Sequence, residues 1–205
     1  MKPNHVLPWL FLVAVCSISA RGSFCQEATC HEIESLAKIA RTRSTDALSR
    51  EKRSAGDNYR AQVVFAARLF ELRPRDKSAA ILLLKLIPQD DAQQTILMTL
   101  GDSLCDSEVI SDMKSLGRLR DALPRQFAGA VLLVPSSMPA YIAYSLTATL
   151  DPHSDYAIHM QRVCRQAHAE FMSAVSLLPS EKRESFTRHI LDPKGCRAIA
   201  LPESE

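Results

Sequence analysis

The chain has 205 residues, with 25 Lys and Arg against 23 Asp and Glu, and 46% of its residues are hydrophobic. Its six glycines are about 3% of the chain, compared with roughly 7% in an average protein. Folds that depend on tight β-turns or glycine-rich phosphate-binding loops are disfavoured, because these structures need the positive φ that glycine adopts easily.

The first residues resemble a secretory signal peptide. An apolar run, Val6 to Ile18, follows Lys2, and its length of about thirteen residues suits a signal core but falls short of the roughly twenty that span a membrane. Residues 1–22 are therefore predicted to be removed during export, and no transmembrane segment is expected. Their loss removes Lys2 and Arg21, which leaves 23 basic and 23 acidic residues. This neutral chain has no overall charge that would favour nucleic acid.

Residues 23–205 are long enough for one domain with a substantial core, and we expect a single helical domain. A capping-box pattern formed by Thr29 and Glu32 predicts the start of a first helix. The polar stretch over residues 41–56 is predicted to be a loop or a frayed helix.

Asp57 is predicted to cap the next helix, which should end at Pro74. A short internal similarity then appears when the chain is shifted by about fourteen residues. Each copy contains a proline turn, an Asp cap at Asp76 or Asp90, and one short apolar helix. Stacked helices of this kind occur in helical-repeat proteins, although two similar core helices in an irregular bundle would give the same pattern.

Proline and small polar residues divide the remaining sequence. We expect a helix from Asp106 or Ser107 that Pro124 breaks, and then a short buried helix, or less readily a strand, over 127–134. Pro139 is predicted to lie at the start of another helix.

Ser154 is predicted to open the longest and most regular helix, which continues to Leu178. A last helix follows from Ser180 to Leu191, and residues 192–205 form a tail. About eight helices result, so the predicted fold is all-α, either an irregular helical bundle or a short helical-repeat, superhelical array. The apolar stripe of the long helix contains Tyr156, Met160, Val163, Ala167, Phe171, Ala174 and Leu178.

One tetrapeptide has an enzymatic counterpart. Gly101-Asp102-Ser103-Leu104 resembles the nucleophile block of GDSL-type esterases, and the resemblance implies Ser103 as a nucleophile. That family also uses an Asp-x-x-His pair near the end of the chain and a Gly-x-Asn-Asp block, and this sequence has neither. Without a base Ser103 has the reactivity of an ordinary alcohol, so we expect no catalytic residue. The structural alternative is that Gly101 ends one helix and Asp102 or Ser103 begins the next.

His153, His159, Cys164 and His168 lie within sixteen residues, as metal ligands often do. On one helix Cys164 and His168 share a face, whereas His159 points roughly 140° away from Cys164. Zinc usually needs three or four ligands. We therefore expect no metal site and no cofactor.

The sequence Arg50-Glu51-Lys52-Arg53 fits the pattern cleaved by furin-like processing proteases. If it is cleaved after Arg53 in an accessible loop, Ser54 begins a processed secreted ligand. The alternative is a solvated charged segment.

Charge is distributed unevenly along the chain. Eleven basic and five acidic residues lie between Lys38 and Lys77, whereas Asp90 to Lys114 holds six acidic residues and one basic residue. A basic surface would attract an acidic partner protein. The alternative is that the two regions face each other inside the protein.

Five cysteines remain after the signal peptide is removed. In an exported protein they are candidates for disulfide bonds, with at least one left over. We predict a bond between Cys164 and Cys196, because a helical hairpin turning at Pro179 and Ser180 would bring them to the same height. The candidates are Cys25, Cys30, Cys105, Cys164 and Cys196.

These observations favour an exported helical protein-interaction or scaffold module without catalytic activity, whose partner is another protein. Two alternatives remain open at this point. One is a small hydrolase that uses Ser103, and the other is a secreted ligand processed after Arg53.

Overall fold

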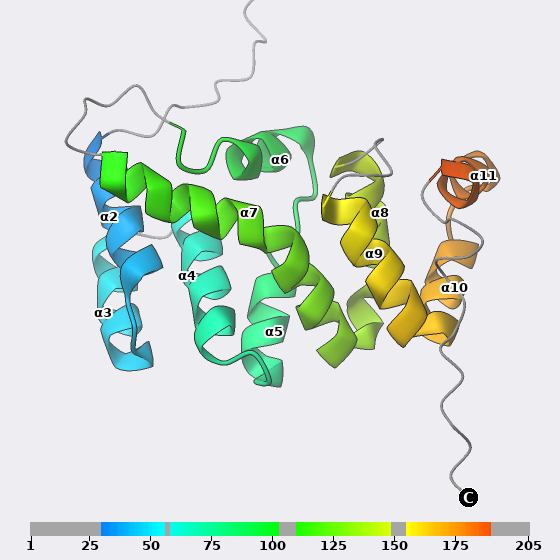
Figure 1. Ribbon diagram of the computed structural model, residues 1–205, viewed down its shortest axis with the longest axis horizontal. Helices are drawn as coiled ribbons and strands as arrows, with labels where there is room; N and C mark the ends of the chain where they lie inside the picture. The colour runs from blue at the N-terminus through cyan, green and yellow to red at the C-terminus, as the bar shows by residue number, and fades with distance from the viewer. Residues whose placement is uncertain (1–29, 56–57, 103–109, 149–154, 190–205) are drawn as a thin grey trace, which may run out of the picture.

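The described part of the chain consists of α-helices and connecting turns (Figure 1). The computed structural model describes residues 30–55, 58–102, 110–148 and 155–189. Ten α-helices and one short 3-10 turn, Pro135–Ser137, lie within these ranges, and none of these residues forms a strand. The prediction of an all-α fold is confirmed. The helices are α2 (Cys30–Arg41), α3 (Thr45–Ala55), α4 (Tyr59–Leu72), α5 (Lys77–Leu84), α6 (Asp91–Met98), α7 (Ile110–Leu133), α8 (Met138–Ala148), α9 (Asp155–Gln166), α10 (His168–Ser176) and α11 (Ser180–His189).

Helix α7 organises the bundle. It runs across the face of the molecule, in front of α2, α4 and α5, and reaches α8 and α9 at the other end (Figure 1). Helix α3 packs on α2 and α4, and α10 packs on α8 and α9. Helix α11 is attached through Phe186, which is fully buried and stacks on Phe171 with 6.1 Å between ring centroids.

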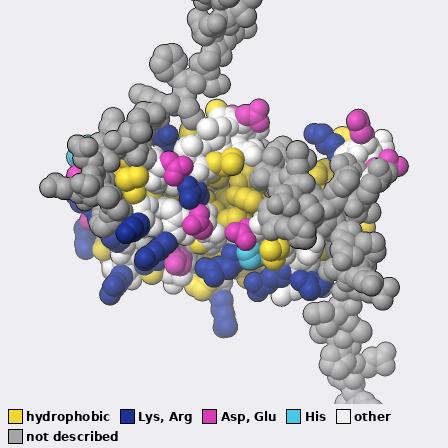
Figure 2. Space-filling model, turned by 45° about the horizontal axis from the view of Figure 1, so that its top comes forward, with side chains coloured by type: hydrophobic (Ala, Val, Ile, Leu, Met, Phe, Trp, Pro, Cys, Tyr) yellow, Lys and Arg dark blue, Asp and Glu magenta, His cyan; other side chains and the backbone are white. Residues whose placement is uncertain are grey.

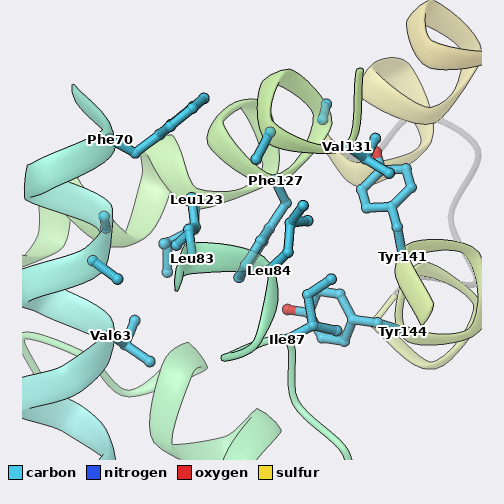
Figure 3. Close-up of a cluster of buried hydrophobic side chains, with 14 of the residues drawn as sticks. Val63, Phe70, Leu83, Leu84, Ile87, Leu123, Phe127, Val131, Tyr141 and Tyr144 are labelled. Atoms are coloured by element: carbon cyan, nitrogen blue, oxygen red, sulfur yellow. The ribbon is translucent and has the colours of Figure 1, made fainter. Parts of the chain in front are cut away.

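The core is a single cluster of buried side chains in which α7 is the common partner. Figure 3 shows Leu123 and Phe127 of α7 pointing toward Leu83 and Leu84 of α5. Removing a side chain of this size from water contributes about 1.5–3 kcal/mol. The apolar residues that recur at helical spacing in the sequence thus pack between the helices.

Three helices begin at Asp or Asn side-chain caps. Asp76 Oδ1 accepts a hydrogen bond from Ser78 N at 2.8 Å, and Asp90 Oδ1 accepts one from Gln93 N at 2.8 Å. Both caps agree with the sequence prediction. Helix α4 is capped by Asn58, one residue after the predicted Asp57, and Asn58 Oδ1 accepts from Ala61 N at 2.8 Å. Asp57 lies outside the described residues.

Residues 41–56 were predicted to be a loop or a frayed helix, and the loop is wrong for most of this length, because α3 occupies Thr45–Ala55. Leu48 is fully buried in the core, so one apolar side chain fixes a helix that is otherwise polar. The Lys52 ammonium group also lies 5.2 Å from the centre of the Phe65 ring, a cation–π contact.

Pro124 does not break a helix, contrary to the sequence prediction. It lies inside α7, where two separate helices were expected. A proline in a helix removes one hydrogen bond and costs about 3 kcal/mol. Leu123 and Phe127, both buried, lie on either side of it, and their packing offsets this cost.

The helix predicted from Ser154 to Leu178 is two helices. The break falls at Ala167, whose ψ of 54° is not helical, and α10 begins at His168. The apolar stripe itself is correct, since Met160 and Phe171 are fully buried. The hairpin from which the cysteine pairing was derived is therefore not a pair of continuous helices.

The two similar segments after Asp76 and Asp90 become α5 and α6, but they pack differently. Helix α5 lies against α4 and α7, whereas the principal contact of α6 is with α4. Equivalent contacts between successive units define a helical repeat. The fold is accordingly an irregular helical bundle.

Gly101 ends the segment after α6 with a φ of 89°, which agrees with the left-handed conformation predicted there. The backbone also passes very close to α7 at this point. A Cβ at position 101 would lie 2.8 Å from the backbone nitrogen of Gly117 and 3.0 Å from the carbonyl oxygen of Met113. Only glycine fits this crossing without a shift of the backbone.

We expect Gly101→Ala to lower the free energy of unfolding by about 1–3 kcal/mol, because it adds both backbone strain and a clash. Gly117→Ala is the matched control. A Cβ there would meet no atom within 4 Å, so alanine should stabilise α7 by about 0.5–1 kcal/mol. Urea denaturation of both variants measures the difference, and equal stabilities would contradict the close crossing.

Candidate functional site

A strongly charged concave surface lies where the end of α2 meets α4 and α7. It is a pocket of about 350 Å³. Four arginines and one glutamate supply its charged lining, so its formal charge is about +3 when all are ionised. The lining residues are Ala40, Arg41, Arg43, Arg68, Glu71, Ser115, Arg118, Leu119 and Ala122. We call this surface the basic pocket.

Arg68 holds one wall of the basic pocket in place. Its Nε donates to the carbonyl oxygen of Thr42 at 2.7 Å, and its Nη1 forms an ion pair with Glu71. Thr42 is also bound to α2, since its hydroxyl donates to the carbonyl oxygen of Lys38 at 2.7 Å. The turn that carries Arg43 is thereby attached to both α2 and α4.

Arg43 and Arg118 both line the basic pocket and are exposed. They come from different walls, the turn after α2 and helix α7, and neither forms an ion pair with any described residue. Figure 2 shows Lys and Arg side chains gathered along the lower edge of the molecule, while several Asp and Glu side chains lie nearer the middle of the view. Exposed Lys and Arg side chains also lie outside the pocket.

The ion pairs of the basic segment are mostly local. Between residues whose side chains are described, the segment from Lys38 to Lys77 forms pairs with Glu32, Glu71 and Asp76. None of these acids belongs to the acidic stretch from Asp90 to Lys114. Asp106 and Glu108 of that stretch lie outside the described residues.

A second hollow lies between α6, α7 and the start of α9. It measures about 360 Å³ and is mainly apolar, with Leu97, Leu123, Pro124 and Tyr156 in its lining. Met98 also lines it and is 63% exposed. Figure 2 shows hydrophobic side chains near the centre of the face.

Four tyrosines, all that the chain contains, approach one another beside the core. The hydroxyl groups of Tyr144 and Tyr156 are 2.7 Å apart and share a hydrogen bond, and their rings meet edge to face at 5.5 Å. The Tyr59 hydroxyl donates to the carbonyl oxygen of Leu86 at 2.8 Å. In Figure 3, Tyr141 and Tyr144 both extend from α8 toward the core.

Burial disfavours a phenolate and raises the pKa of Tyr59, Tyr141, Tyr144 and Tyr156. The phenols consequently remain protonated near neutral pH. The cluster can donate hydrogen bonds, but it cannot supply a general base, and its hydrogen bonds join α8 to α9 and α4 to the turn after α5.

We expect Tyr144→Phe and Tyr156→Phe each to lower the free energy of unfolding by about 1–3 kcal/mol, because each leaves the other hydroxyl without this partner. The double variant removes both hydroxyls, and its cost should be smaller than the sum of the single costs. Urea denaturation of all four proteins completes the cycle. If the cost of the double variant equals the sum of the two single costs, the two hydroxyl groups do not stabilise each other through this hydrogen bond.

The esterase-like tetrapeptide is partly described. Gly101 forms the close crossing with α7, and Asp102 Oδ1 accepts a hydrogen bond from Arg120 Nη1 at 3.0 Å. Ser103 and Leu104 lie outside the described residues. The first two residues of the tetrapeptide therefore have structural contacts in the fold.

The four His and Cys residues that lie within sixteen positions of one another are only partly brought together. Cys164 Sγ lies 3.8 Å from His168 Nδ1, although the two residues belong to different helices. Among the described residues, no three His, Cys, Asp or Glu side chains are placed to hold a metal ion. His153 lies outside the described ranges.

Partial burial lowers the pKa of His159, and Asp155 opposes this effect while Arg162 and Arg125 add to it. A lowered pKa favours the neutral imidazole in the folded state. The stability linked to His159 is therefore present above the unfolded pKa of about 6.5 and is lost as the pH falls below it.

Most of the candidate disulfide cysteines lie outside the described residues. Cys25, Cys105 and Cys196 lie outside the described residues, and Cys30 opens α2 without a described side chain. Cys164 is fully buried near the end of α9.

The processing sequence lies in a helix and not in a loop. Arg50, Lys52 and Arg53 all belong to α3. Processing proteases bind extended chain, so cleavage after Arg53 requires the end of α3 to unwind. The product would also lose α2 and α3, which pack on α4.

The sequence alone indicated the basic character of this region but not the pocket. Arg118 lies about forty residues beyond the basic segment, and only the crossing of α7 over α2 and α4 brings it close to Arg43.

No helix within the described ranges combines the length and the apolar character needed to cross a membrane. Comparisons with protein-family models, curated proteins and solved structures find no match for this chain.

Proposed function

We propose that the protein is an exported helical protein-interaction module without catalytic activity, and that its basic surface binds an acidic partner protein. The observation that carries the proposal is a set of exposed basic side chains that form no ion pair with any described residue. Within the segment from Lys38 to Lys77 this set contains Lys38, Arg43, Arg50, Arg53, Arg75 and Lys77.

A group of uncompensated positive charges favours an acidic partner in two ways. It increases the rate of encounter at low ionic strength, and its arginines can form paired hydrogen bonds with carboxylates. The exported chain is expected to carry balanced charge overall, so this attraction comes from the distribution of the charges and not from their sum. Loss of residues 1–22 as a signal peptide remains part of the proposal.

A labelled poly-glutamate peptide should bind the purified protein, and raising the salt concentration from 50 to 300 mM should weaken binding by roughly tenfold, because exposed charges are screened. The double variant Arg50→Glu/Arg53→Glu should also weaken binding. Fluorescence anisotropy measures both effects.

A matched control reverses two charges at the other end of the bundle. Arg162→Glu/Arg165→Glu changes two exposed arginines of α9 and should leave binding nearly unchanged. A poly-glutamine peptide should not bind. If poly-glutamate fails to bind even at 50 mM salt, the proposed acidic partner is wrong.

The two alternative functions have direct tests. Ester hydrolysis that disappears in Ser103→Ala would support a hydrolase. A mature N-terminus at Ser54 would support a processed ligand, whereas the interaction module should begin near residues 20–26.

We also propose that Cys164 pairs with Cys196, since the buried Cys164 lies in an expected oxidising compartment. The bond would close the loop of chain between the two cysteines. In the chain-entropy model this closure adds about 3–4 kcal/mol to the free energy of unfolding. Peptide mapping of the unreduced protein should recover the two cysteines in one linked pair. Recovery of Cys164 joined to another cysteine, or as a free thiol, would contradict the pairing.

A further inference from the structure

We propose that the basic pocket binds two carboxylate side chains of an acidic peptide segment, one at Arg43 and the other at Arg118. This inference rests on the proposed function and assigns the binding of the acidic partner to one site. The occupant is a stretch of polypeptide rich in Asp and Glu, inserted between α2, α4 and α7.

The charges of the basic pocket are complementary to those of an acidic peptide. The lining of the pocket contains four arginines and a single carboxylate, Glu71, which is already bound by Arg68. Arg43 and Arg118 therefore contribute positive charge that no described acid balances. Each guanidinium group can bind one carboxylate through two parallel hydrogen bonds.

The wall of the pocket is organised before a ligand binds. The hydrogen bond from Arg68 Nε to the Thr42 carbonyl oxygen attaches the turn next to Arg43, and the Thr42 hydroxyl attaches the same turn to α2. Arg118 extends from α7, whose neighbouring residues Leu116 and Leu119 are buried. Binding therefore requires little ordering of the backbone, which limits its entropic cost.

The size and lining of the pocket favour a peptide over a small anion. Its volume of about 350 Å³ is roughly ten times the 30 Å³ that one water molecule occupies in the liquid. A single phosphate or sulfate ion would leave most of that space to water. Ala40, Leu119 and Ala122 add apolar surface against which the methylene groups of Glu side chains can pack.

The test compares single variants of the pocket. The probe is a fluorescein-labelled ten-residue peptide of alternating Glu and Ala, and its affinity is measured by anisotropy at 50 mM salt. We expect Arg43→Glu and Arg118→Glu each to weaken binding at least tenfold. Both side chains are exposed, so circular dichroism should show unchanged helix content. Arg162→Glu on α9 is the control with the same charge change and should bind as the unaltered protein does.

Arg118→Lys distinguishes a specific contact from general attraction. It keeps the charge but removes the planar group with paired donors, so an affinity between those of the unaltered protein and Arg118→Glu supports the carboxylate contact. An unchanged affinity in Arg43→Glu and Arg118→Glu, with salt-dependent binding still present, would overturn the pocket assignment and leave the proposed function standing. A protein that binds no acidic peptide at all would overturn the proposed function itself.

Two competitors distinguish the class of ligand. Inorganic phosphate and a heparin oligosaccharide are added to the labelled complex at the same concentration as unlabelled peptide. Displacement by the peptide alone supports the inference. Stronger displacement by phosphate or by heparin would overturn it and assign the pocket to a different anion.

Discussion

The fold depends on the packing of one helix against two groups of helices. Helix α7 packs with α2, α4 and α5 and, toward its other end, with α8 and α9. Phe127 lies at the centre of this arrangement, fully buried and 5.7 Å from the ring of Tyr144. Neither group retains its complete core without α7, so the apolar faces of the other helices are arranged around it.

The same packing positions the basic pocket. Leu116 and Leu119 face the core, and because neighbouring residues on a helix point in different directions, Arg118 is directed outward. The close crossing at Gly101 holds the segment after α6 against α7 beside Gly117, the residue directly before Arg118. The position of the basic pocket therefore follows from the packing of α7.

Local features were predictable from sequence, and long-range ones were not. Asp76 and Asp90 cap their helices because the interaction involves only the next few residues. The helix break predicted at Pro124 is wrong, because contacts with residues far away in the chain offset the cost of placing a proline inside a helix. The break at Ala167 has no glycine or proline to mark it. The basic pocket needs Arg43 and Arg118 together, and only the tertiary path of α7 brings those residues to one place.

The position of α7 along the chain also affects the order in which the protein can fold. Helices α2, α4 and α5 lie before residue 85, yet α7, which packs on all three, ends at Leu133. A chain that emerges from its N-terminus exposes the apolar faces of these helices until α7 follows. Contacts between segments so distant in sequence also slow folding. If the chain is exported as proposed, this delay would help to keep it unfolded during translocation.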